Sequence, residues 1–354
     1  MTPRQRVITA LRHEKADRIP RYDILLAGFR EQWRQARQCD AQAEIFDDYP
    51  TIDIGTVLAN QTGPFSSGIW RRDINTERYQ ERDSWGRRIE FSRSGTFFEV
   101  LETALQEKSH LDTLIFEDPW SPAAVENYTQ MEAAIHHRFA PVSGVMGLFM
   151  PSYYLRGELD LLIDLKEDEA FCRALAERVA DFICAQGEQA LRVTGTWDTA
   201  IWVYDELGNN KSAIMSPETF ERIYLPPYRR SIAHWKSLGA ANIILHCDGN
   251  CLALLDLLLE AGFTGIQGVN PTAGMTVPSV RAAYGHRVSL IGGMCNIQVL
   301  REGSKDDIEH SVAEIIEVAR NGGVIIGTHS IDDDIPIENY DYYHQVLADY
   351  DERW

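Results

Sequence analysis

The segment Leu-His-Cys-Asp-Gly-Asn at residues 245–250 carries the residues best suited to chemistry. Side chains alternate along a strand, so His246 and Asp248 share one face while Cys247 points the opposite way. An imidazole and a carboxylate at this spacing can hold one divalent cation, and catalytic zinc takes three protein ligands. His329, which follows a second apolar run, is the natural third ligand. The pattern predicts a metal site of His246, Asp248 and His329, with plain hydrogen bonding between polar strand ends as the alternative.

Further polar residues directly follow apolar runs, where they are costly to bury unless they face a cleft or pair with one another. Asp205 and Glu206 point to opposite faces of a strand, so only one of them can be aimed at a pocket as a general acid or base. The alternative is an acid that stabilises a helix N-terminus. The expected catalytic residues are Asp205, Glu206 and His246. The expected substrate-binding residues are Tyr22, Tyr204, Gln267, Asn270 and Asn296.

Short apolar strands alternate with helices through the second half of the chain, which is typical of parallel strands with right-handed crossovers. The strands are expected at 200–207, 242–249, 265–270, 288–294 and 323–330, with earlier ones at 18–25 and 139–149 and an eighth within 94–118. This count predicts an α/β fold, a (β/α)8 TIM barrel. Catalytic residues are then expected at the carboxyl ends of the strands.

The barrel accounts for about 250 residues and leaves the remainder for additions. We expect residues 1–354 to form a single domain, with an N-terminal extension and an irregular insertion at about 40–130. The alternating stretch 78–93 in that insertion predicts an antiparallel hairpin. An open doubly wound sheet is the competing fold, but the chain has neither GxGxxG nor GxxxxGK[ST].

The chain is acidic, with 53 Asp and Glu against 34 Lys and Arg and a net charge of −19. Nucleic acid and anionic lipid would be repelled, so neither is an expected partner. No apolar run reaches the roughly 18 residues of a membrane span, and the N-terminus lacks the apolar core of a signal peptide. The six Cys form no CxxC pair and indicate reduced thiols, Cys295 included. The expected location is the cytoplasm.

Several segments, in order, resemble the uroporphyrinogen decarboxylase superfamily, whose members are single (β/α)8 barrels. They lie at 1–23, 83–91, 153–171, 204–230, 245–250, 268–277, 290–296 and 322–340. True uroporphyrinogen decarboxylases open with an Arg-rich stretch that grips the substrate carboxylates. The matching region here, 18–30, has Arg21 and Arg30 but not that motif.

The resemblance therefore favours the corrinoid-dependent methyltransferases of the superfamily. In that branch a zinc ion is held by a His-x-Cys pair and a later Cys, and the matching positions are His246, Asp248 and His329. Replacement of two thiolates by a carboxylate and an imidazole makes a harder site. Such a site suits polarisation of an oxygen or nitrogen leaving group.

The resemblance implies a methyltransferase that moves a methyl group between a small methylated compound and a corrinoid protein or another acceptor. Zinc and a corrinoid carried by a partner protein are the implied cofactors. One alternative is a decarboxylase-like lyase acting on a carboxylated substrate. A second is a non-catalytic accessory protein that binds a corrinoid or tetrapyrrole. The sequence does not decide whether the protein forms a homodimer.

Overall fold

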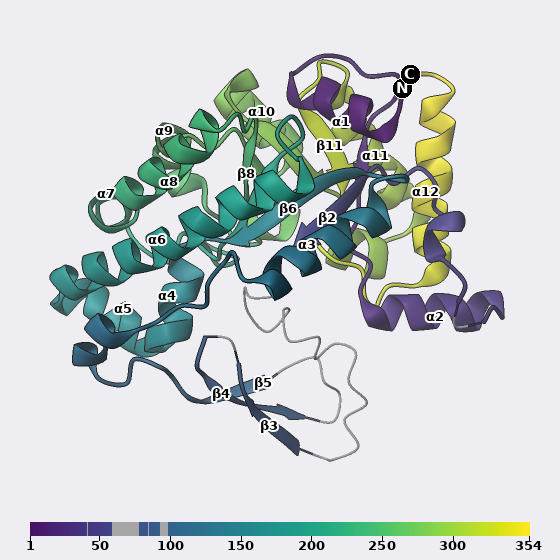
Figure 1. The fold of residues 1–354 in the computed structure, drawn as a ribbon. Coiled ribbons are helices and arrows are strands. Elements are labelled where there is room, and N and C mark those ends of the chain that lie inside the picture. Colours follow the sequence, from purple (N-terminus) through teal and green to yellow (C-terminus); the bar gives the residue numbers. More distant parts are fainter. Residues whose placement is uncertain (41, 59–77, 84, 93–97) are drawn as a thin grey trace.

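The computed structural model describes residues 1–40, 42–58, 78–83, 85–92 and 98–354. Its centre is a sheet of parallel strands in the order β1-β11-β10-β9-β8-β7-β6-β2 (Figure 1). The strands are β1 (Arg21–Tyr22), β2 (Ile54–Leu58), β6 (Ala140–Met146), β7 (Ile201–Tyr204), β8 (Ile243–His246), β9 (Gly265–Val269), β10 (Ser289–Gly293) and β11 (Val324–Gly327). Asp53 closes the ring between β1 and β2, because its N–H donates to the Arg21 carbonyl at 2.9 Å. The predicted (β/α)8 barrel is confirmed.

Helices surround the barrel as an outer layer (Figure 1). They are α1 (Pro3–Leu11), α2 (Ala27–Arg37), α3 (Pro122–Ile135), α4 (Phe149–Arg156), α5 (Glu158–Glu167), α6 (Glu169–Thr194), α7 (Pro217–Ile223), α8 (Leu225–Ser237), α9 (Leu255–Ala261), α10 (Val277–Tyr284), α11 (Lys305–Ala319) and α12 (Ile337–Asp351). Local sequence sets several starts: Ser216 caps α7 with Pro217 at the first helical position, as the sequence indicates.

The barrel interior is filled by apolar side chains from alternate positions of the strands, including Trp202, Ile244 and Ile291. Val7 and Leu11 of α1 belong to the same cluster. The Ala10 carbonyl accepts a hydrogen bond from Gly323, just before β11, so α1 covers the amino ends of the strands. The opposite, carboxyl end is left for the functional groups, as the barrel rule requires.

The second barrel strand is not where the sequence predicts it. The expected strand within 94–118 is wrong, and Ile54–Leu58 takes its place between β1 and β6. Residues 98–102 instead form the edge of a small antiparallel sheet, and 94–97 lie outside the described residues. The sequence Phe-Glu-Val-Leu-Glu places an acid on each face of the strand, whereas a parallel barrel strand is covered on both faces.

The small sheet consists of β3 (Arg78–Arg82), β4 (Arg88–Ser92) and β5 (Phe98–Glu102). Its β3–β4 pair confirms the predicted hairpin. Trp85, in the turn between them, packs against Phe116, Tyr154 and Phe182 of the barrel layer. The sheet follows the carboxyl end of β2 in the chain and is therefore attached on the side of the barrel mouth (Figure 1).

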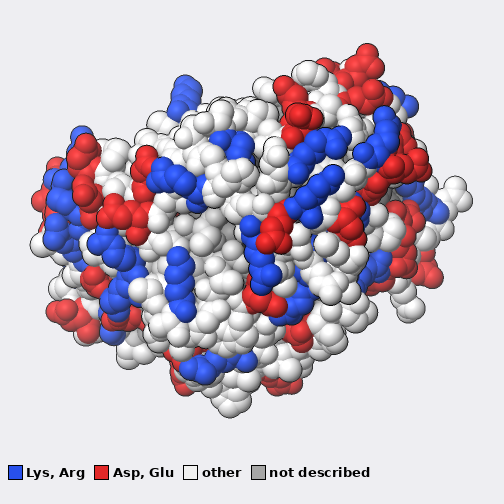
Figure 2. Space-filling view, turned by 90° about the horizontal axis from the view of Figure 1, so that it is seen from above, with Lys and Arg blue, Asp and Glu red and all other residues white. Residues whose placement is uncertain are grey.

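Both termini lie on the face opposite the small sheet (Figure 1). Seen from that side, Lys and Arg are interspersed with Asp and Glu instead of forming a basic field (Figure 2). Within the described part of the chain, no helix combines the length and apolar character that a membrane crossing requires.

Candidate functional site

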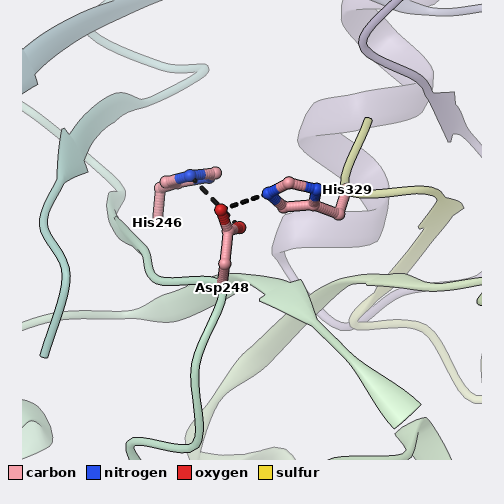
Figure 3. Close-up of side chains that lie close together, drawn as sticks. All are labelled: His246, Asp248 and His329. Carbon is pink, nitrogen blue, oxygen red and sulfur yellow. Dashed lines mark ion pairs between the residues drawn. The ribbon is translucent and has the colours of Figure 1, made fainter. Parts of the chain in front are cut away.

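Three side chains from two distant segments meet at the carboxyl end of the barrel. His246 is the last residue of β8, Asp248 follows two residues later, and His329 follows β11. The Asp248 carboxylate lies between the two rings (Figure 3): His246 Nε2 is 3.3 Å from Oδ1, and His329 Nε2 contacts Oδ2. Ligand atoms of all three residues lie within 4.8 Å of one another. The expected meeting of these residues is confirmed, and their role as ligands remains a proposal.

Glycine at position 268 allows Asp248 to reach this position. Gly268 has a φ of +91°, and a Cβ there would lie 2.6 Å from the Cys247 carbonyl oxygen and 3.2 Å from Asp248 Oδ1. Asn270 Nδ2 donates to the Asp248 carbonyl at 3.2 Å. The end of β9 thus supports the loop that follows β8. Cys247 is 2% exposed and packs in the core, as its alternation with His246 predicts.

Each imidazole is held at its Nδ1 atom by a neutral side chain. His246 Nδ1 contacts Oε1 of Gln267, the residue opposite it on β9. His329 Nδ1 lies 2.8 Å from Ser330 Oγ. The Nε2 atom of each ring is the one directed to Asp248. Histidines that bind metals are usually held in this manner, with the second nitrogen on an outer partner.

The charges of this group are strongly coupled. Burial lowers the pKa of His246, but the Asp248 carboxylate outweighs burial and raises that pKa to about 9. Burial raises the pKa of Asp248, yet the two imidazoles hold it well below its usual range. The carboxylate is therefore ionised at neutral pH and attracts a positive centre, whether a proton or a metal cation.

The structure separates the two adjacent carboxylates that the sequence left as alternatives. Asp205 is fully buried, and its oxygens accept hydrogen bonds from the backbone N–H groups of residues 148–150, at 2.7–3.0 Å, and from the Tyr228 hydroxyl. Gly147 makes room for it, since a Cβ there would lie 2.3 Å from Asp205 Oδ2. These contacts hold the N-terminus of α4. Asp205 thus stabilises a helix start, as the alternative interpretation expects, but the helix is α4 and not the one that follows Asp205 in the chain. These contacts favour that alternative over a catalytic role, which stays a prediction.

Glu206 lines the cavity at the barrel mouth. Burial, followed by the nearby negative charge of Asp248, raises the pKa of its carboxyl to about 8. A carboxyl group with a pKa near neutrality can both give and take a proton, which is the property of a general acid or base. Of the two adjacent acids, Glu206 is the one that lines the cavity.

The cavity has a volume of about 300 Å³, and most of its lining residues carry polar side chains. Its described lining contains no Lys or Arg, and Ile297 is its one large apolar side chain. The lining residues are Glu206, Gly208, Asn209, Asn210, Asp248, Gly249, Asn270, Thr272, Asn296, Ile297, His329 and Ser330. Such a space suits a small polar molecule and offers no cationic group for a polyanion.

Two of the five expected substrate-binding residues, Asn270 and Asn296, line the cavity. The other three are not part of its lining. The Tyr204 ring packs on His246 with ring centroids 4.7 Å apart, the Tyr22 and Tyr204 hydroxyls are hydrogen-bonded, and Gln267 contacts His246. These three support the site from within the barrel.

Sequence reasoning missed the loop 208–210 as part of the cavity lining. Its polar run Gly-Asn-Asn begins one residue after the Asp-Glu pair at a strand end, which was a usable signal. The loop lies close to the next one: a Cβ on Gly208 would be 2.4 Å from the Asn250 carbonyl oxygen. Glycine at this position lets the loops after β7 and β8 touch.

Comparison with known proteins agrees with the fold. A methyltransferase from Methanosarcina mazei has a similar structure over 99% of both chains, with a TM-score of 0.67 and 14% identity. A B12-independent methionine synthase from Shewanella sp. W3-18-1 reaches a TM-score of 0.45 at 10% identity, covering 87% of this chain and 84% of its own. A putative vitamin-B12 independent methionine synthase from Listeria monocytogenes reaches 0.44 at 14% identity, covering 95% of each chain.

No curated protein sequence matches the chain. The sequence model of uroporphyrinogen decarboxylase (URO-D), in contrast, matches residues 116–350. This range includes β6 to β11 and therefore every residue of the His246, Asp248 and His329 group. The chain belongs to the uroporphyrinogen decarboxylase family.

Proposed function

We propose that this protein is a methyltransferase that moves a methyl group between a small methylated compound and a corrinoid carried by a partner protein. The observation that carries the proposal is the group of two imidazoles and one carboxylate at the mouth of the barrel, beside a polar cavity. The fold shared with a methyltransferase from Methanosarcina mazei supports it.

The residues at the site fit a divalent metal ion. His246, Asp248 and His329 would hold it, and Asp248 Oδ1 is buried without a hydrogen-bond partner among the described residues. Two imidazoles and one carboxylate form a known zinc donor set with an open position. When bound, the ion would act as a Lewis acid toward the oxygen, nitrogen or sulfur atom that gives up or accepts the methyl group.

The chain itself supplies proton transfer and orientation. Glu206 can take the proton from an acceptor heteroatom in the cavity, or return one to a demethylated leaving group, because its pKa is raised to about 8. Asn270 and Asn296 offer amide groups that can orient the compound beside the ligand group. The corrinoid would approach from the open side of the cavity.

The cavity gives less support to decarboxylation of a polyanionic tetrapyrrole. Recognition of several carboxylates favours clustered guanidinium groups. The described lining instead contains two acids, Glu206 and Asp248, and no Lys or Arg. The ionised Asp248 would repel a carboxylated substrate.

Metal analysis tests the first part of the proposal. We expect about one equivalent of zinc or another first-row divalent metal in the purified protein, and loss of that metal in His246→Ala. No bound metal in either sample would end the metal-assisted version.

Turnover tests the second part. The loss of methylcobalamin absorbance is followed with a panel of small alcohols, amines and thiols as acceptors, and we expect Glu206→Gln to slow it by about 10²-fold or more. Methylcobalamin that stays intact with every acceptor, together with carbon dioxide release from a carboxylate, would favour the lyase instead.

A further inference from the structure

Gln267 lies directly opposite His246 on the neighbouring strand of the barrel. It is fully buried, and its Oε1 atom contacts His246 Nδ1. We propose that Gln267 is a positioning residue that fixes the His246 ring with Nε2 free to bind a cation beside Asp248. This inference rests on the proposed metal site and adds a residue that holds the ligand without touching the metal.

The argument begins from the proton of the imidazole. A neutral imidazole has one N–H, and an amide oxygen can only accept a hydrogen bond, so contact with Gln267 Oε1 places the proton on Nδ1. His246 Nε2 is then left to face Asp248 Oδ1 at 3.3 Å. A positive centre fits between these two atoms, a proton in the metal-free protein or a metal cation that displaces it. The backbone register that pairs His246 with Gln267 builds this arrangement into the barrel.

The other end of the Gln267 side chain supports the same conclusion. Its Nε2 atom is buried and has no hydrogen-bond partner among the described residues. A buried unpaired polar group costs about 1–3 kcal/mol, which offsets what the Oε1 contact with His246 contributes to stability. Stability therefore does not account for glutamine here, whereas the contact with the imidazole does.

Ser330 provides an internal comparison. Its Oγ lies 2.8 Å from His329 Nδ1, so it is the counterpart of Gln267 for the second imidazole. His329 is 30% exposed, against 9% for His246. Water can take the place of the Ser330 hydroxyl but cannot easily reach His246 Nδ1. Gln267 should therefore matter more for metal affinity than Ser330.

The test measures metal affinity and not activity. Metal-stripped protein is titrated with Zn²⁺ in competition with a chromophoric chelator, and Co²⁺ absorption reports the ligand geometry. We expect Gln267→Met to bind Zn²⁺ about 10–100-fold more weakly than wild type, and Ser330→Ala to fall between the two. Gln267→Glu keeps an acceptor oxygen and should retain or strengthen binding. The metal-free Tm of Gln267→Met should stay close to that of wild type, because removal of the unpaired Gln267 amide nitrogen offsets the loss of the partner of His246 Nδ1.

Gln189→Met is the matched control, because Gln189 is also a fully buried glutamine, on α6, with both amide atoms unpartnered among the described residues. Its Zn²⁺ affinity should stay that of wild type. Equal Zn²⁺ affinity in wild type and Gln267→Met would overturn the role of Gln267 and leave the proposed metal site intact. So would a loss in Gln267→Glu as large as in Gln267→Met. A wild type that binds neither Zn²⁺ nor Co²⁺ would overturn the proposed metal site, and the inference with it.

Discussion

Replacement of Asp205 by asparagine should destabilise the fold and leave the metal ligands in place. The Asp205 oxygens accept five hydrogen bonds: Oδ2 from Leu148 N, Phe149 N and the Tyr228 hydroxyl, and Oδ1 from Met150 N and Glu206 N. The asparagine oxygen can accept the three hydrogen bonds that Asp205 Oδ2 accepts in wild type. The NH₂ group then takes the place of Oδ1 and faces the N–H groups of Met150 and Glu206, which lose their acceptor in a fully buried place.

Each buried donor that loses its partner costs about 1–3 kcal/mol, so the two together predict a loss of roughly 2–6 kcal/mol in the free energy of unfolding. Urea unfolding at pH 7, followed by far-ultraviolet circular dichroism, measures it. Asp112→Asn is the control, because Asp112 is exposed and its replacement should change stability by less than about 0.5 kcal/mol. If the free energy of unfolding of Asp205→Asn lies within about 1 kcal/mol of the wild-type value, the lost hydrogen bonds do not stabilise the fold, and the helix-start role is refuted. Loss of turnover without loss of stability would restore Asp205 as a catalytic residue.

Two further predictions concern the acid beside Asp205 and the glycine beside Asp248. The raised pKa of Glu206, about 8, means that the folded protein favours the neutral carboxyl, so its contribution to stability is present at low pH and is lost as the pH rises from its ordinary value toward 8. Metal-free Glu206→Gln should therefore gain stability over wild type between pH 5 and pH 8 in urea unfolding, and parallel pH profiles of the two proteins would contradict the shift. Gly268→Ala should weaken Zn²⁺ binding by roughly 10-fold or more, since its Cβ would displace Cys247 and Asp248. Gly239→Ala is the control, because Gly239 shares a positive φ, +110°, with nothing within 4 Å of an added Cβ; equal Zn²⁺ affinity in both variants would count against the close approach.

Patterns that are local in the chain gave the fold class and the outline of the site. Strand and helix periods depend on residues a few positions apart, and the two-residue alternation of His246, Cys247 and Asp248 holds wherever the strand lies. The convergence of parallel strand ends then made His329 a reasonable partner for a pair more than 80 residues earlier.

Other features depend on contacts that no local pattern contains. Ile54–Leu58 is a barrel strand because it pairs with β6, whereas 98–102 pairs with β4 in the small sheet. Gln267 was predicted to bind substrate, but the register of β8 and β9 places it against His246. Register is a property of two strands and cannot be read from one.

The sequence by itself determined that imidazoles and carboxylates stand at the ends of barrel strands, because that follows from hydrophobic runs and their spacing. Only the tertiary structure decided which carboxylate is available. Asp205 and Glu206 are chemical equivalents in the chain, and the N-terminus of α4, about 55 residues earlier, occupies one and leaves the other at the cavity. A group's chemistry is set by the donors and charges around it, and folding brings those together from distant segments.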